Sequence, residues 1–166
     1  MQEVLTSISE KILVVSFCCL LLVLFVNRRR TAFEAILFLS CLLTAFQVWF
    51  EIKVLGMSGD TLQLEYWYFG FAITDFFHSV VCVAICKKSK LVMDKGTIAL
   101  LLGFAAAGIL QLARYADRII FETNILAGVY HSGIPTINTM MMVAVISCTV
   151  IACWDSVKMF FNRRSV

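Results

Sequence analysis

Three residues that could carry chemistry lie close together in an apolar part of the chain. Asp75 and His78 are three residues apart, and Thr74 precedes Asp75. On a helix, side chains at i and i+3 share a face. At about 1.5 Å per residue from Glu65, Asp75 is about 15 Å along such a helix, near the middle of a bilayer.

An ionisable side chain at that depth is costly, and it typically faces a bundle interior, a pore or a partner. Histidine changes its charge near neutral pH. Asp75, His78 and Thr74 are therefore our candidate intramembrane site for an ion or a proton. The alternative is structural, in which the pair, or a protonated Asp75 alone, forms buried hydrogen bonds that fix helix packing.

A second polar set is predicted at the outer third of the membrane. It is a candidate outer vestibule, and its members come from three apolar segments: Gln47, Gln111, Arg114 and Asn138. The alternative is ordinary hydrogen bonding between helices, which contributes about 0.6 kcal/mol for each contact.

Small residues recur at four-residue spacing in the fourth and fifth apolar segments. This spacing lets helix backbones approach closely and is typical of packing faces within a chain or between copies. The candidate faces are Ala99, Gly103 and Ala107, and Ala144, Cys148 and Ala152.

Enzymatic chemistry is not predicted. The seven cysteines all fall in apolar segments without a Cys-x-x-Cys motif, and free cysteine behaves as a small hydrophobe. His78 and His131 differ too much in depth for a pair of haem ligands. Hydrolase motifs such as Gly-x-Ser-x-Gly are absent from the sequence. We expect no metal, no cofactor and no catalytic residue.

The elements that position these residues are predicted to be membrane-spanning helices. The chain is 61% hydrophobic and 15% charged, against about 45–50% and about 25% in soluble domains. Apolar segments fall at about 5–26, 32–50, 67–86, 97–118 and 135–157. The sequence predicts an all-α, polytopic helical membrane protein with about five transmembrane helices. Residues 1–166 would form one bundle domain, with no soluble domain.

The first segment is short, with Lys11 near its start. If it did not span, four spans would remain and the N-terminus would be cytoplasmic. We also expect residues 51–66 to be an outer loop and residues 121–133 to be a short interfacial or re-entrant piece. Pro135 is expected in the first turn of the last helix, where its missing N–H is harmless.

Basic residues are concentrated on one side of the predicted spans. Of the 14 lysines and arginines, ten lie in three alternate links or ends. Such residues mark the cytoplasmic side. The N-terminus is therefore predicted outside and the C-terminus in the cytoplasm, most simply at the inner membrane of a bacterium. The cytoplasmic anchors are Arg28, Arg29, Arg30, Lys87, Lys88, Lys158, Arg163 and Arg164.

The favoured function is a non-enzymatic, homo-oligomeric inner-membrane protein. It would act as a pore or channel, or as the sensor or anchor subunit of a larger complex. One alternative is a small proton- or cation-coupled transporter that uses Asp75 and His78. Another is a membrane immunity or phage-defence component. The expected partners are the lipid bilayer, other copies of the chain, and a soluble or membrane protein at the cytoplasmic face. Nucleic acid is not expected.

Overall fold

The computed structural model describes residues 2–26, 32–57 and 59–162, with side chains at 2–10, 13, 60 and 159–162 left aside. These residues form helices and no strand. The elements are α1 (Gln2–Val26), α2 (Ala32–Leu55), α3 (Asp60–Lys88), α4 (Lys95–Tyr115), a π-helix η1 (Ala116–Ile120) and α5 (Ala127–Asn162). The predicted all-α fold is confirmed.

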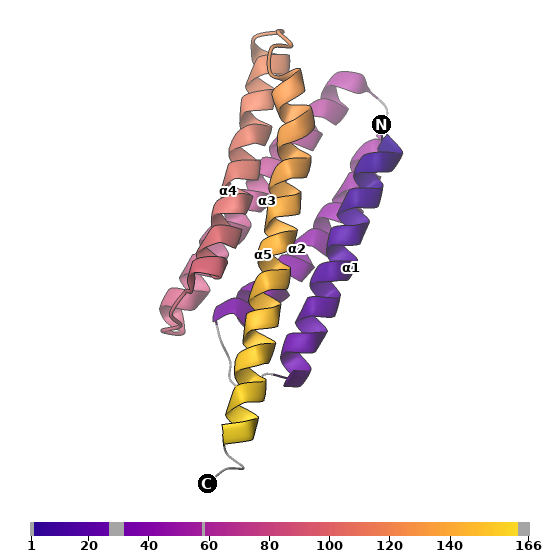
Figure 1. Ribbon diagram of the computed structural model, residues 1–166. Helices are drawn as coiled ribbons and strands as arrows, with labels where there is room; N and C mark the ends of the chain where they lie inside the picture. The colour runs from indigo at the N-terminus through magenta and orange to yellow at the C-terminus, as the bar shows by residue number, and fades with distance from the viewer. Residues whose placement is uncertain (1, 27–31, 58, 163–166) are drawn as a thin grey trace.

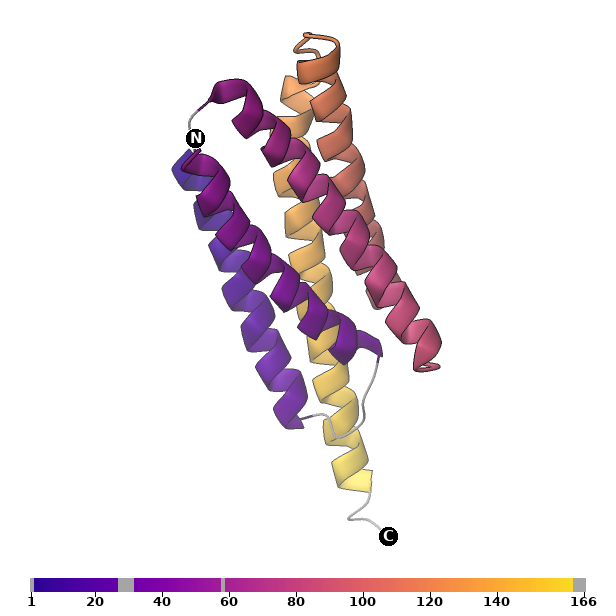
Figure 2. The ribbon, with the colours of Figure 1, turned by 180° about the vertical axis from the view of Figure 1, so that it is seen from behind.

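The helices form a ring in which each one packs against its neighbours in the chain (Figures 1 and 2). The contacts run from α1 to α2, α3, α4 and α5, and α5 closes the ring by packing against α1. An apolar cluster that includes Leu20, Leu37, Leu100 and Val145 joins α1, α2, α4 and α5. The ring therefore has an inside, which all the long helices surround.

Four helices are long and apolar enough to cross a membrane: Ala32–Leu55, Thr61–Lys88, Lys95–Ile120 and Ala127–Lys158. A shorter apolar stretch, Val14–Val26, lies in α1. The protein is therefore an integral membrane protein of about five helices. Whether the first segment crosses the whole membrane stays a prediction.

The link between α2 and α3 is shorter than we predicted. Residues 51–66 were expected to be a loop, but α2 continues to Leu55 and α3 begins at Asp60. The described residues between them are Gly56, Met57 and Gly59, and Gly59 has a φ of 120°, which favours glycine. The prediction was wrong because it ended the helices where the hydropathy falls, whereas both helices continue through polar residues: Glu51 is buried in α2, and Glu65 lies within α3.

The fall in hydropathy also led us to place the start of the last helix too late. We expected α5 to begin at Pro135, but it begins at Ala127, and Pro135 lies inside the helix. The piece predicted to be interfacial or re-entrant, 121–133, is therefore mostly the first two turns of α5.

The predicted packing faces are partly used within this chain. A Cβ at Gly103 would lie 2.5 Å from Met141 Cγ of α5, so the two helices are close there. Ala107 is buried, whereas Ala99 is exposed. Ala144 and Cys148 pack against the apolar cluster, and Ala152 is half-buried. Contact between copies stays a prediction.

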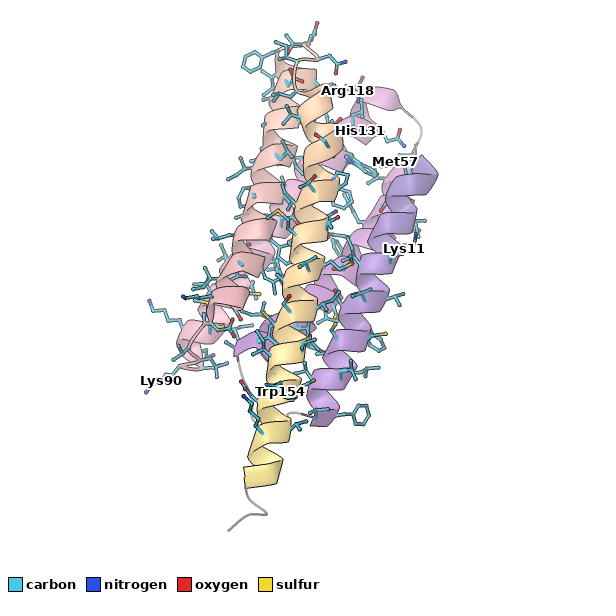
Figure 3. All side chains as sticks on the ribbon, in the orientation of Figure 1. Lys11, Met57, Lys90, Arg118, His131 and Trp154 are labelled. Atoms are coloured by element: carbon cyan, nitrogen blue, oxygen red, sulfur yellow. The ribbon has the colours of Figure 1, made fainter. Side chains whose placement is uncertain are left out.

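The two ends of the bundle separate the links as the charge pattern predicted. Met57, Arg118 and His131 lie toward the end that carries the N-terminus, and Lys90 and Trp154 toward the other (Figure 3). The last turn of α3 carries Lys87 and Lys88, and the last third of α5 carries Lys158. All three lie toward the end with Lys90 and Trp154 (Figure 1). The other predicted anchors, Arg28, Arg29, Arg30, Arg163 and Arg164, lie outside the described residues.

Candidate functional site: a cavity inside the ring

The ring encloses a cavity of about 580 Å³ to which all five long helices contribute residues. Closure of the ring by α5 makes the space available, because α1 and α4 do not have to meet across it. A cavity of this size is in the range of small-molecule sites, about 300–1,000 Å³.

Asp75 lies in the cavity wall, where it is 5% exposed. Its Oδ1 accepts a hydrogen bond of 2.7 Å from Gln47 Nε2. The same amide nitrogen lies 3.2 Å from Thr74 Oγ1, and Thr74 in turn donates to the carbonyl of Phe71. Among the described residues, Oδ2 of Asp75 has no hydrogen-bond partner, and neither oxygen forms an ion pair.

His78 does not contact Asp75 and does not line the cavity. Its Nε2 forms a hydrogen bond of 3.1 Å with Ser40 Oγ of α2. Cys82 Sγ lies 3.5 Å from the same nitrogen, and the ring packs edge-on against Phe104 at 4.5 Å between centroids. His78 therefore belongs to the packing between α2, α3 and α4, while Asp75 belongs to the cavity.

A stripe of polar side chains on α2, which the sequence analysis did not identify as a unit, faces the cavity. We call it the α2 polar stripe: Ser40, Thr44, Gln47 and Glu51. Ser40, Thr44 and Glu51 are buried, and Gln47 is half-buried. The signal was present in the sequence, because offsets of four, seven and eleven residues fall on one helix face.

The four predicted vestibule residues, Gln47, Gln111, Arg114 and Asn138, all line this cavity. Tyr130 was missed and joins them: its hydroxyl donates to Gln111 Oε1 at 2.8 Å and accepts from Trp67 Nε1 at 3.3 Å. Arg118 donates to Tyr68 Oη at 3.3 Å nearer the outer end. What this polar region does stays a prediction.

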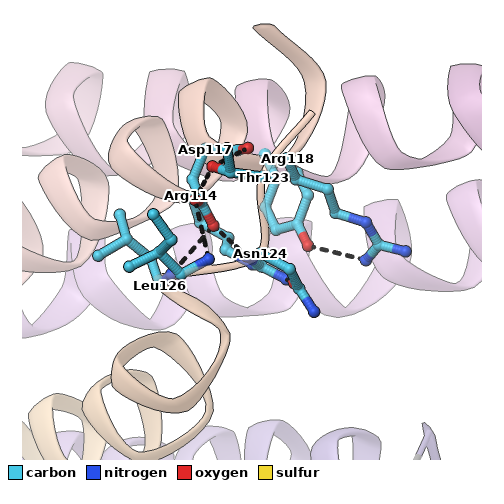
Figure 4. A network of polar contacts seen from close by, with 8 residues as sticks. Arg114, Asp117, Arg118, Thr123, Asn124 and Leu126 are labelled. Carbon is cyan, nitrogen blue, oxygen red and sulfur yellow. Dashed lines mark hydrogen bonds and ion pairs between the residues drawn. The ribbon is translucent and has the colours of Figure 1, made fainter. Parts of the chain in front are cut away.

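Arg114 is tied to the link between α4 and α5 (Figure 4). It is 5% exposed, forms an ion pair with Asp117 in η1, and donates a hydrogen bond to Asn124. Asp117 also accepts from the Thr123 hydroxyl and from the backbone N–H groups of residues 125 and 126, each at 3.1 Å. One carboxylate thus fixes both the arginine and the turn that leads into α5.

The wall opposite the α2 polar stripe is apolar. It comes from α4 and α5 and includes a phenylalanine and two methionines: Leu100, Phe104, Met141, Met142 and Val145. Methionine is flexible and polarisable, so such a wall adapts to ligands of different shapes. The cavity therefore has one polar side, one apolar side and a carboxylate deep inside.

No described group of three or more His, Cys, Asp and Glu side chains could hold a metal ion. Comparison of the chain with protein-family models, curated proteins and solved structures finds no match. The functional argument therefore depends on the geometry of the cavity.

Proposed function

We propose that this protein is a small carrier in which one chain holds the solute in its cavity and Asp75 takes up the coupling proton or cation. The observation that carries the proposal is the position of Asp75, a carboxylate in a solute-sized cavity with one oxygen left without a partner among the described residues.

The surroundings of Asp75 suit reversible ion binding better than fixed pairing. A structural carboxylate in a membrane is typically neutralised by a partner. Here Gln47 donates one hydrogen bond and supplies no charge. The negative charge of Asp75 must therefore be neutralised by a proton or by a positively charged ligand. The replacement of one by the other couples the movement of two solutes.

Reconstituted liposomes with a trapped pH dye test the proposal. Addition of a transported solute should move protons through wild-type protein, and Asp75→Asn should abolish that movement. Asp155→Asn is the matched control, because Asp155 is exposed in the last third of α5 and outside the cavity. Equal proton movement in the two variants would exclude a coupling role for Asp75.

The orientation and membrane are part of the same proposal. The end with Lys87, Lys88 and Lys158 would face the cytoplasm, because lysines near span ends mark that side. A bacterial inner membrane is the simplest location for such a chain, and the outer mouth of the cavity would then open away from the cytoplasm.

A second candidate is the oligomeric pore, or a sensor or anchor subunit of a complex. The observation in its favour is the exposure of α5. Of the apolar stretch of this helix, 11% is buried, against 28–33% of the corresponding stretches of α2, α3 and α4. A second copy or another protein could cover this helix. Native mass spectrometry from nanodiscs separates the candidates: the carrier predicts one complete cavity per chain even in a monomer, whereas the pore requires several copies.

A further inference from the structure

We propose that the solute bound in the cavity is a lipophilic organic monocation, with its positive charge at Asp75 and its apolar body against the methionine wall of Met141 and Met142. This inference rests on the carrier proposed above and adds the chemical class of its substrate.

The first step is the balance of charge around the cavity. Among the residues whose side chains are described, four charged ones line it: Glu51 from α2, Asp75 from α3, Arg114 from α4 and Arg118 from η1. The charge of Arg114 is offset by Asp117 through their ion pair. Asp75 accepts a hydrogen bond from Gln47 and forms no ion pair with a described residue, so its ionised carboxylate presents one negative charge to the cavity and attracts a monocation.

The second step is where that charge lies. Arg118 bonds to Tyr68, which lies seven residues before Asp75 on α3. Seven residues of helix span about 10 Å, so Arg118 is at the outer mouth and far from the Asp75 carboxylate. The deep part of the cavity is therefore anionic, and the unpartnered Oδ2 of Asp75 is available to a cation that reaches it.

The third step is the remaining surface, which fits an apolar body. Phe71, Phe104 and Trp67 bring aromatic rings to the cavity, and the faces of such rings attract cations. Met141 and Met142 adapt to groups of varied shape. A strongly hydrated inorganic cation would lose its water here without enough oxygen ligands in return, whereas an organic cation has little hydration to lose.

The exchange balances in atoms and charge. In the empty site Asp75 carries a proton, and when the cation arrives the O–H bond breaks and the proton leaves through the outer mouth to water. One positive charge replaces another, and no other bond changes. The other described titratable groups that face the cavity are Tyr68, which bonds to Arg118, Tyr130, which bonds to Gln111, and His131. His78 lies in the wall behind it.

The test uses two probe ions of the same shape and opposite charge, tetraphenylphosphonium and tetraphenylborate. Each is titrated into the full-length protein in nanodiscs, with protein-free nanodiscs as the blank. We expect saturable binding of one tetraphenylphosphonium per chain, with release of about one proton, and no saturable binding of tetraphenylborate. Asp75→Asn should weaken the binding of tetraphenylphosphonium by at least tenfold, which is about 1.4 kcal/mol. Asp155→Asn should bind as wild type does.

A chemical experiment on the wild-type protein covers the case in which Asp75→Asn does not fold. Dicyclohexylcarbodiimide modifies protonated carboxyls in apolar surroundings, and the modified residue is identified by peptide mass spectrometry. Tetraphenylphosphonium should slow modification of Asp75 in proportion to its occupancy, and tetraphenylborate should not. Unchanged modification at a saturating concentration of the cation overturns the inference.

The outcomes separate this inference from the carrier itself. If the cation does not bind but a neutral or anionic solute drives proton movement that depends on Asp75, the substrate class is wrong and the carrier stands. If the cation binds at Asp75 but neither protons nor cation cross the liposome membrane, the site stands and the carrier is wrong.

Discussion

Asp75 and His78 show how far the spacing of two residues can be interpreted. Three residues turn a helix by about 300°, so their side chains share a face but point about 60° apart. In this ring that angle is enough to separate them: Asp75 points to the cavity, and His78 points to Ser40 and Phe104. The spacing placed both residues on one helix but could not show that one side chain lies in the cavity wall and the other in the packing between α2, α3 and α4.

Replacement of His78 should therefore affect stability and leave the cavity working. We expect His78→Leu to lose the hydrogen bond to Ser40 and to cost about 1–3 kcal/mol, measured by thermal unfolding in detergent. Ser40→Ala should show a similar loss, since it removes the same bond. Proton movement should persist in His78→Leu; its abolition in this variant would place the histidine in the coupling site after all.

Among the described glycines, Gly96 leaves the least room for a Cβ, and a second substitution can relieve the clash. A Cβ at this position would lie 2.0 Å from Cys148 Sγ. Gly96→Ala should destabilise the protein by about 1–3 kcal/mol, as overpacked sites do. Gly128→Ala is the control, because nothing lies within 4 Å of a Cβ there. The double variant Gly96→Ala, Cys148→Ala should regain most of the loss in thermal unfolding, and a failure to regain it would mean that the two helices are not in contact at this point.

At the scale of elements, hydropathy located the helices but not their ends. Apolar side chains face lipid along most of each span, so their runs were visible in the sequence. The last turns of α2 and the first turns of α5 instead bring Glu51 and His131 to the cavity, and their polarity was mistaken for loops. Reliance on hydropathy also concealed the α2 polar stripe, because a membrane helix that lines a polar cavity can carry polar residues along one face.

The link between α4 and α5 should depend on one carboxylate. Asp117→Ala removes the acceptor for the N–H groups of Ile125 and Leu126 and leaves Arg114 buried without its partner. We expect hydrogen exchange at residues 123–126 to speed up by at least tenfold. Glu122→Gln, at an exposed neighbouring position, should leave it unchanged; equal protection in Asp117→Ala would show that the link is held by other contacts.

For the whole molecule, the order of helices around the ring follows the order in the chain. Short links restrict consecutive helices to neighbouring positions, so contacts such as α1 with α2 could be predicted. Contact between α5 and α1 could not, because it joins the two ends of the chain and depends on the fit of side chains such as Val145 and Leu20. The cavity depends on that closure, and so it was also not predictable.

The orientation of the ring in the membrane can be measured with single cysteines. Ile125 and Val92 are exposed apolar residues in links at opposite ends of the bundle, 81% and 90% exposed. Ile125→Cys should react with a membrane-impermeant maleimide in intact cells, and Val92→Cys should react only after permeabilisation, above the background from the native cysteines. The reverse pattern would invert the proposed orientation and leave the arrangement of the helices unchanged.

Pro135 gives α5 a point at which it can bend. Proline has no N–H, so the carbonyl of His131 lacks its usual partner in the helix, and the backbone is softer there than elsewhere. Both residues line the cavity. The eight residues of α5 before the proline thus form a short lever, a helical segment that is connected to the link in which Asp117 makes its hydrogen bonds. The longer segment of α5 after the proline stays packed on α1 and α4. A swing of this lever alters the width of the outer mouth while the floor of the cavity, with Asp75, keeps its shape.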